Sequence, residues 1–150
     1  MEQDKRINKF ISDSGLCSRR EADHAVRDGR VTVNGMTATV GMTVSEGTDV
    51  RIDGKRISER PSAVLIAVNK PVGIVCTSFP AEKNNIVDFV NHKERIFPIG
   101  RLDKDSEGLI LMTNDGNLVN RIIRSRYAHE KEYVVTVDKT ITKAFIQKMG

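Results

Sequence analysis

The chain has 150 residues, of which 39% are hydrophobic and 29% are charged, and its formal net charge is +4. This length suffices for one ordinary domain, or for one small domain and part of another, and the composition excludes a chain that is disordered throughout. The first ten residues lack the apolar centre of a signal peptide, and no run of about 18 apolar residues occurs, so we expect a protein of the cytoplasm.

The first unit predicted along the chain covers residues 5–53 and begins with two helices. One apolar face at helical spacing, formed by Ile7, Phe10 and Ile11, predicts a short helix over residues 6–14. Ser18 and Glu21 have the spacing of a capping box, which predicts a second helix over residues 19–28.

Short strands are predicted after the helices. The Asn34-Gly35 pair in "VTVNGMTATV" is a strong signal for a hairpin with a two-residue turn, and "DVRID" predicts one more strand. The polar segment 54–62 contains a proline and is interpreted as a linker to a second unit, residues 63–150.

The second unit has a mixed α+β pattern in which strands dominate. Strands are predicted at "AVLIAVNKP", "GIVCTS", "RIFPIGRLD", "GLILMTND" and "EKEYVVTVD". Helices are predicted at "NNIVDFVNH", "NLVNRIIRS" and "ITKAFIQKM", the middle one capped by Asp115 with Leu118, Val119 and Ile122 facing inward.

Basic residues concentrate on the two N-terminal helices, where residues 5–30 hold seven Lys/Arg against four Asp/Glu. Arg19 and Arg20 lie in the first turn of a helix, where positive charge opposes the helix dipole. Helix N-termini also attract phosphates, so the pattern fits a surface for a polyanion as well as an ordinary solvated face.

The order of residues favours the first interpretation. The segment from "RINKF" through "SRREA" and "GRVTVNG" to "EGTDVRI" resembles the S4 RNA-binding domain along its whole length. S4 domains contact structured RNA through their two helices, so the resemblance implies RNA contacts at six residues: Arg6, Lys9, Arg19, Arg20, Arg27 and Arg30. Phosphate contacts carry no sequence information, so the resemblance does not indicate which RNA is bound.

The stretch "PIGRLDKDSEGLILMTNDG", residues 98–116, has five charges between Arg101 and Glu107, followed by an apolar run. A solvated turn is one interpretation. An EF-hand loop is disfavoured because Asn114 stands where a bidentate Glu is needed and the flanks are strand-like. A phosphatase Asp-x-Asp motif is disfavoured because no apolar strand leads directly into Asp103.

A carboxylate acting on a sugar is a further interpretation, which the spacing alone does not favour over a solvated turn. Cleavage of an N-glycosidic bond requires an ionised carboxylate near the anomeric carbon. A nearby cation keeps such a group charged, and on a strand Arg101 would share a face with Asp103.

Three segments of the second unit resemble the ribosomal-type pseudouridine synthases, in the branch typified by the small-subunit enzyme. "GRLDKDSEGLILMTNDG" is similar to that family's signature, "VNKPVGIVCT" to its entry strand and turn, and "HEKEYVVTV" to the segment with its active-site tyrosine. Within the family, "VNHKERIFPIGRLDKDSEG" most resembles the large-subunit synthases of type F, with types B and E and the small-subunit enzyme as alternatives. The resemblance implies an α+β fold: an S4 domain, then the N-terminal part of a mainly antiparallel catalytic domain.

The resemblance also implies roles for individual residues. Asp103 would be the catalytic aspartate, which attacks the ribose or removes its 2′ proton, and Tyr133 would stack beside the uracil. Arg101 would fill the gap in the RNA helix or steady the flipped nucleotide, and Lys70 and Lys131 would contact phosphates. The expected reaction isomerises a uridine in ribosomal RNA. The first expected substrate is the 23S RNA of the large subunit, and tRNA is a further substrate class.

Other partners and cofactors are not expected. Two cysteines 59 positions apart and three scattered histidines predict no metal site, and no glycine-rich nucleotide motif occurs, so we expect no cofactor. No recognition helix or dimer signal supports binding to DNA, and no long apolar run predicts a membrane partner. The family's catalytic domain continues beyond the tyrosine segment, so we expect this chain to be an incomplete catalyst. Open strand edges would let it self-associate, whereas the full protein is expected to be a monomer. The alternative is a non-catalytic RNA-binding or ribosome-assembly module.

Overall fold

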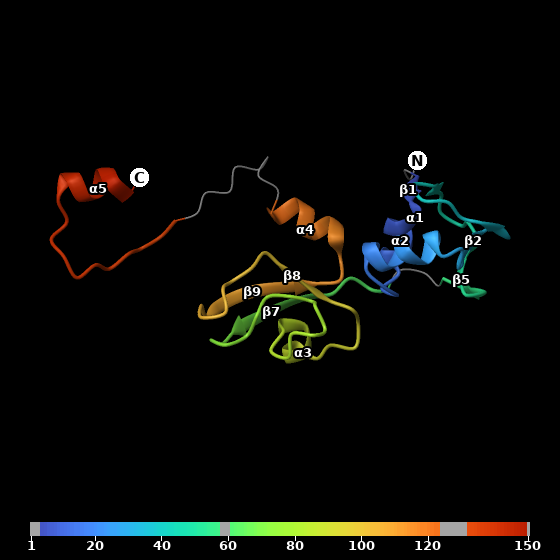
Figure 1. Cartoon of the computed structure of the whole chain (residues 1–150). Coiled ribbons are helices and arrows are strands. Elements are labelled where there is room, and N and C mark those ends of the chain that lie inside the picture. The colour runs from blue at the N-terminus through green and yellow to red at the C-terminus, as the bar shows by residue number, and fades with distance from the viewer. Residues whose placement is uncertain (1–3, 58–60, 124–131, 150) are drawn as a thin grey trace.

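The computed structural model describes residues 4–57, 61–123 and 132–149, which form two units joined through a short connection (Figure 1). The first unit contains two helices packed against each other, α1 (Ile7–Asp13) and α2 (Arg19–Arg27), as the sequence predicted. Its strands are β1 (Lys5–Arg6), β2 (Val31–Val33), β3 (Met36–Thr37), β4 (Thr43–Val44), β5 (Val50–Ile52) and β6 (Lys55–Arg56). They form a four-stranded sheet in the order β3-β2-β5-β6 and a separate β1-β4 pair.

The core of the first unit lies between the helices and the strands. It is built from aliphatic side chains, among them Ile7 and Ile11 of α1, Ala22 and Val26 of α2, and Val31 of β2. All five are at most 3% exposed, so the apolar faces predicted for both helices are confirmed. Phe10, predicted on the same face of α1, is only partly buried at the edge of this core.

The capping box at the start of α2 is also confirmed. The Ser18 hydroxyl accepts a hydrogen bond from the Glu21 backbone N–H at 3.2 Å, and the Glu21 carboxylate accepts one from the Ser18 N–H at 2.6 Å. These two bonds satisfy donors that would otherwise lack partners at the helix start. The bonds to Ser18 hold the pKa of Glu21 below its ordinary value.

We expect Ser18→Ala to lower the free energy of unfolding by about 1 kcal/mol, because the cap hydroxyl is lost. Because its folded pKa is lowered, Glu21 contributes stability above its unfolded pKa of about 4.5, and this is lost as pH falls through the folded pKa. Urea unfolding at neutral and acidic pH measures both effects. Glu21→Gln should lack the acid-dependent part, and equal acid sensitivity in Glu21→Gln and the unmodified chain would contradict this account of the cap.

The predicted hairpin at Asn34-Gly35 joins β2 to β3, with both residues at positive φ, 49° and 83°. A second two-residue turn of this kind was missed. Asp53 and Gly54 have φ of 48° and 77° and join β5 to β6 in antiparallel register. Residues 55–57 were assigned to the linker, but β6 belongs to the sheet and Ile57 is buried in the first core. The prediction failed because placing the linker start at residue 54 divided an Asp-Gly turn pair.

The second unit is organised around an antiparallel sheet in the order β7-β9-β8, with α3 and α4 on opposite faces (Figure 1). Its elements are β7 (Leu65–Lys70), α3 (Ile86–Val90), β8 (Phe97–Ile99), β9 (Gly108–Thr113) and α4 (Gly116–Ile123). Val68, Ile110 and Met112 point from the sheet into a core that includes Ile86 of α3 and Cys76. The mixed helix and antiparallel-sheet architecture expected from the sequence is therefore confirmed.

Three details of the second unit differ from the prediction. Residues 74–78 contribute only a single bridge, between Val75 and Asn85, and no strand. In α4, Ile122 is 36% exposed rather than inward-facing, and no residue of the helix is fully buried. Within the described part of the chain, the 74–78 segment lacks a neighbouring strand to pair with, and α4 lacks a surface that would bury its apolar face.

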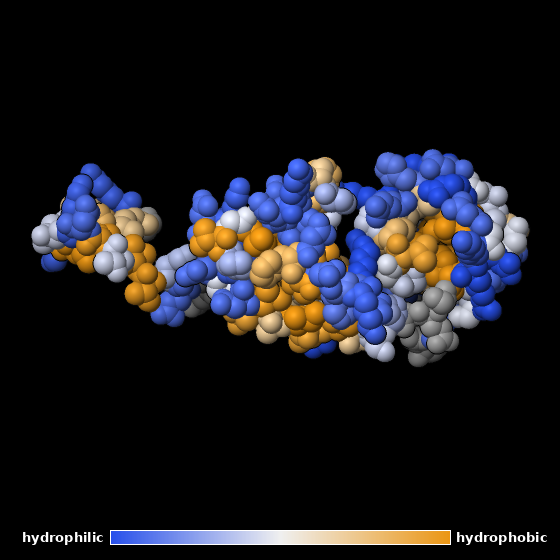
Figure 2. All heavy atoms as spheres, turned by 90° about the horizontal axis from the view of Figure 1, so that it is seen from below, coloured by the Kyte–Doolittle hydropathy of each residue, from blue (hydrophilic) through white to orange (hydrophobic). Residues whose placement is uncertain are grey.

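The described part of the strand predicted over "EKEYVVTVD" differs as well, because residues 132–137 have no regular structure. Val134 is 95% exposed, and the segment leads away from the sheet to α5 (Lys143–Met149), the last predicted helix (Figures 1 and 2). An alternating sequence forms a strand only where a neighbouring strand accepts its hydrogen bonds, and neither β7 nor β8 pairs with this segment. Among the described helices, none is both long and apolar enough to cross a membrane.

Candidate functional site

Asp103 lies at the tip of the connection between β8 and β9, where the charged stretch forms a turn. Gly100 has φ of 80°, a conformation that favours glycine, and it lets the chain leave β8. The Ser106 N–H donates to the Asp103 carbonyl at 3.1 Å, which closes the turn. Asp103 and Asp105 are exposed, so the turn presents carboxylates to solvent on a fixed backbone.

The geometry of Arg101 differs from the prediction. β8 ends at Ile99, and residues 101–103 are not in a strand, so Arg101 and Asp103 do not share a strand face. No ion pair joins the two side chains within the described residues, and both are exposed. The argument that a buried Asp needs a neighbouring cation therefore does not apply to this carboxylate, which water solvates.

Lys70, at the end of β7, braces the turn from inside the protein. Its side chain is 0% exposed, and Nζ donates to the carbonyls of Pro71 at 2.9 Å, Ile74 at 2.8 Å and Lys104 at 3.3 Å. An ammonium group has three donors, and all three are used here. The prediction that Lys70 contacts phosphate is therefore wrong, because a buried group with no free donor cannot bind a ligand.

Two further bonds tie the 71–76 segment to the Asp103 turn. The Gly73 N–H donates to the Lys104 carbonyl at 2.8 Å, and the Leu102 N–H donates to Cys76 Sγ at 3.4 Å. The Lys104 carbonyl thus accepts from both Lys70 and Gly73. Together these contacts fix the backbone on both sides of Asp103 without using its carboxylate.

The predicted aromatic and basic residues near the C-terminus are not brought to this turn. The Tyr133 side chain is 76% exposed, and within the described residues no hydrogen bond or ring contact joins it to Asp103. Lys131 lies outside the described residues. The structure therefore leaves the roles predicted for both residues untested.

The six basic residues predicted to contact RNA fall into two groups. Lys9 is ion-paired with Asp13 at 2.6 Å, and Arg30 with Asp53 at 3.0 Å. The other four are exposed and have no carboxylate partner among the described residues: Arg6, Arg19, Arg20 and Arg27. Unpaired exposed cations are the ones that a polyanion can bind without breaking an existing ion pair.

The comparisons with known proteins cover both units. The profile of the S4 domain matches residues 5–50, and the profile of the RNA pseudouridylate synthase family matches residues 64–149. The second match alone covers more than half of the chain. The chain belongs to the RNA pseudouridylate synthase family.

Named relatives agree with this family. The chain is similar to the dual-specificity RNA pseudouridine synthase RluF of Escherichia coli O6:H1, at 59% identity over 97% of this chain and 51% of the relative. It is also similar to the ribosomal large subunit pseudouridine synthase B of Bacillus subtilis, at 34% identity over 97% of this chain and 60% of the relative. A solved crystal structure of a pseudouridylate synthase aligns with 81% of this chain and 54% of the other, at 25% identity and a TM-score of 0.43. The chain thus spans about half the length of the type F relatives that it matches.

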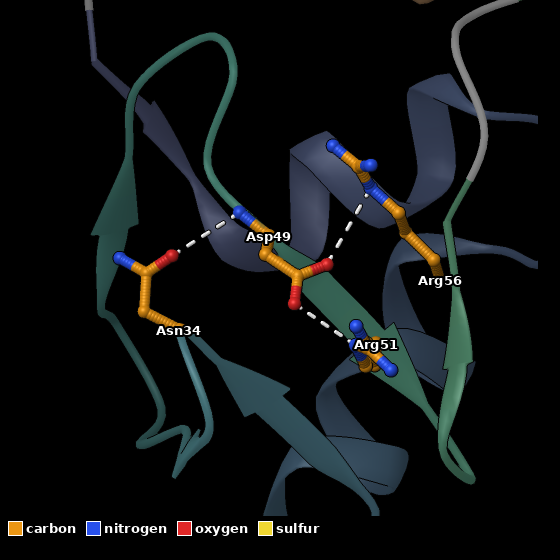
Figure 3. Close-up of polar contacts among 4 residues, drawn as sticks. All are labelled: Asn34, Asp49, Arg51 and Arg56. Carbon is orange, nitrogen blue, oxygen red and sulfur yellow. Dashed lines mark hydrogen bonds and ion pairs between the residues drawn. The ribbon is translucent and has the colours of Figure 1, made fainter.

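This pseudouridylate synthase chain also has a charged cluster that sequence reasoning missed (Figure 3). Asp49, at the start of β5, accepts a hydrogen bond from Arg51 Nε at 2.9 Å and lies 3.4 Å from Arg56 Nε. Its backbone N–H donates to the Asn34 side-chain carbonyl at 3.2 Å, which ties the cluster to the first hairpin. One carboxylate thus faces two arginines, so Arg51 and Arg56 offer less free positive charge than the sequence suggests.

The family's signature does not form a metal loop in this chain. The flanks of the Asp103 turn are the strands β8 and β9 rather than helices. Within the described part of the chain, no group of three His, Cys, Asp or Glu side chains is arranged to hold a metal ion. The EF-hand interpretation is therefore not supported by the geometry.

Proposed function

We propose that the complete protein isomerises uridine to pseudouridine in RNA, with Asp103 as the catalytic carboxylate. The observation that carries this proposal is the braced turn: in a chain of this family, the carboxylate of the signature motif is exposed to solvent on a backbone fixed by buried Lys70. A fixed backbone keeps the exposed carboxylate close to one position, so less freedom is lost when it meets a substrate, which favours catalysis.

The proposed reaction exchanges one bond of the uracil for another. The N1–C1′ bond breaks, the base turns within the pocket, and C5 bonds to C1′, while the C5 proton leaves and N1 gains a proton. Asp103 either attacks C1′ or removes the 2′ proton, and both routes require an accessible carboxylate. No electrons are exchanged with another molecule, so the proposed reaction requires no redox cofactor.

The remaining predicted residues have supporting roles in this proposal. Tyr133 stacks on the flipped uracil, a contact worth roughly 1–3 kcal/mol per base, and its exposed ring leaves it available for this role. Arg101, exposed beside Asp103, steadies the flipped nucleotide, and Lys131 contacts a phosphate. Because Tyr133 has no contact with Asp103 here, the arrangement requires the 132–137 segment to take a different course in the complete enzyme.

RNA binding is proposed for the first unit, through the exposed and unpaired arginines Arg6, Arg19, Arg20 and Arg27. The ion-paired Lys9 and Arg30 contribute less, since binding would have to compete with Asp13 and Asp53. The domain division that supports this proposal places the RNA-binding unit at residues 5–57 and the catalytic unit from residue 63. The RNA is proposed to be ribosomal, in keeping with the name of the Bacillus relative, and the protein to act in the cytoplasm.

Activity is proposed for the complete protein and not for these 150 residues. The chain covers 51% of the Escherichia coli relative, and we propose that the other half supplies the basic partner of Asp103 and the rest of the pocket. The test is the pseudouridine content of ribosomal RNA from cells lacking the gene, with and without the complete gene restored. Restoration should return one or more modified positions, and unchanged maps would refute the proposed function.

We expect the 150-residue chain by itself to self-associate. β7 and β8 are both edge strands, and Tyr133, Val134 and Val135 are more than half exposed. Analytical ultracentrifugation should show an average mass that rises with concentration, and less so in a Val134→Glu variant. A single monomeric species at all concentrations would contradict this expectation.

A further inference from the structure

A polar cleft lies where the two units meet, at the opposite end of the sheet from Asp103. Its cavity of about 340 Å³ is lined by Ser12, Ser18 and Arg19 of the first unit and by Arg95, Asn114 and Asn120 of the second, among others. On the face seen from below, Figure 2 shows hydrophilic residues between the two units. We call this cavity the interdomain cleft.

Basic side chains outnumber acidic ones in the lining of the interdomain cleft. Arg19 and Arg95 both line it, and neither has a carboxylate partner among the described residues. Asp13 also lines it, but Lys9 already neutralises that carboxylate at 2.6 Å. Two guanidinium groups thus line a cavity whose other polar side chains, apart from Asp13, are hydroxyls and amides that can donate hydrogen bonds.

Both guanidinium groups are positioned by contacts with the protein. A side-chain carbon placed on Gly116 would lie 3.9 Å from Arg19 Nη2, so Arg19 of α2 lies against the first residue of α4 in the other unit. The Arg95 guanidinium carbon lies over the Phe97 ring, 5.9 Å from its centroid, within the range of a cation–π contact. Arg19 and Arg20 are adjacent in the sequence but about 100° apart around α2, so only Arg19 faces the interdomain cleft.

The charge of Arg95 also reaches the first unit. Burial, and to a smaller extent Glu21, raises the pKa of the Cys17 thiol, and the Arg95 cation opposes that shift. Arg95 also helps to lower the pKa of Glu21, after the two larger effects of Ser18. A cation on the second unit thus favours negative charge at the start of α2, across the boundary.

We propose that the interdomain cleft binds a single backbone phosphate of the RNA, held by Arg19 from one unit and Arg95 from the other. The inference rests on the proposed function for the identity of the ligand as RNA. Planar guanidinium groups donate in pairs to phosphate oxygens, and the serine hydroxyls and asparagine amides of the cleft supply further donors. One phosphate would therefore contact both units and hold them in one orientation.

The position of the interdomain cleft gives it a defined place along the RNA. Strand β9 begins at Gly108 beside the Asp103 turn and ends at Thr113 beside the cleft, and a six-residue strand is about 17 Å long. RNA that reaches from the cleft to Asp103 thus follows the length of the sheet. The phosphate site therefore sets the distance between a bound region of RNA and the uridine that reacts.

The test measures RNA affinity of the complete protein at several salt concentrations, for Arg19→Gln, Arg95→Gln and the double variant. Arg121→Gln is the matched control, since Arg121 is exposed on α4 and does not line the cleft. Each single variant should lower affinity about tenfold and reduce the dependence of log affinity on log salt by about 0.7–0.9. The double variant should lose less than the product of the two single losses, because both arginines bind the same phosphate.

Several results would overturn the inference. It fails if the cleft variants bind RNA as tightly as Arg121→Gln, or if the two losses multiply fully. A second probe, inorganic phosphate alone, is followed by the NMR signals of the Arg19 and Arg95 Nε–H groups. If phosphate shifts these signals but RNA affinity does not depend on either arginine, the site binds a free anion and the RNA assignment is wrong.

Binding and turnover separate this inference from the proposed function. Because the cleft is remote from Asp103, the loss in Arg95→Gln should appear as a raised KM for RNA. A protein that binds RNA through the cleft but forms no pseudouridine would refute the proposed function and leave the inference standing.

Discussion

Asp103→Asn in the complete protein is expected to lower the rate of pseudouridine formation on the order of 10³-fold or more. An amide is neither a nucleophile toward C1′ nor a base toward the 2′ position, so both proposed routes lose their essential group. The change keeps the shape of the side chain, and the turn is held by backbone bonds and Lys70 rather than by the Asp103 carboxylate. Single-turnover assays with a ribosomal RNA fragment would measure the loss.

Asp105→Asn is the matched control for this experiment. Asp105 lies two residues away, is also exposed and carries the same charge. We expect it to retain turnover within a few fold, and both variants to bind RNA as tightly as the unmodified protein. Full activity in Asp103→Asn, or an equal loss in the two variants, would contradict the assignment of Asp103.

Lys70→Met is expected to have the largest effect on stability. Methionine fills a similar volume but leaves the carbonyls of Pro71 and Ile74 without the donor that Lys70 provides in a buried site, whereas the Lys104 carbonyl keeps its bond from the Gly73 N–H. Unsatisfied buried acceptors cost about 1–3 kcal/mol each, and relaxation recovers part of this, so we expect a loss on the order of 3 kcal/mol. Urea unfolding, followed by a probe in the second unit, would measure it.

The same variant should also lower turnover, because the turn that holds Asp103 loses its internal brace. Lys104→Met is the control: Lys104 contributes its backbone carbonyl to Lys70, while its own side chain is in solvent. It should change stability by less than about 0.5 kcal/mol. Lys70→Met with normal stability would show that the three carbonyl bonds do not support the fold, and the account of the turn would fail.

Local signals in the sequence predicted the local structure well. The capping box of α2 and the Asn34-Gly35 turn involve residues within a few positions of one another, so their geometry follows from short-range chemistry. The same rule failed at Asp53-Gly54 only because the segment boundary was drawn between the two residues. Asp103 was found through the resemblance of its motif to the family's signature.

Long-range contacts account for what the sequence did not predict. The Lys104 carbonyl lies 34 positions from Lys70, so nothing in the sequence distinguishes a buried brace from a lysine that contacts phosphate. Arg95 was not predicted as a binding residue because it lines the same cleft as Arg19 of the other unit, and no pattern in the sequence links these two positions. Apolar and polar residues alternate in the 132–138 segment as they do in a strand. This alternation gives a strand one apolar face, but it does not supply the neighbouring strand that must accept its hydrogen bonds.

The release of tritium from RNA labelled at C5 of uridine tests the central claim most directly. Joining C5 to C1′ expels the C5 hydrogen, so the complete protein should release tritium in proportion to the pseudouridine that it forms. The Asp103→Asn variant should bind the same RNA and release essentially none. Tight RNA binding by the complete protein without tritium release would show that this chain belongs to a binding protein and not to a working synthase.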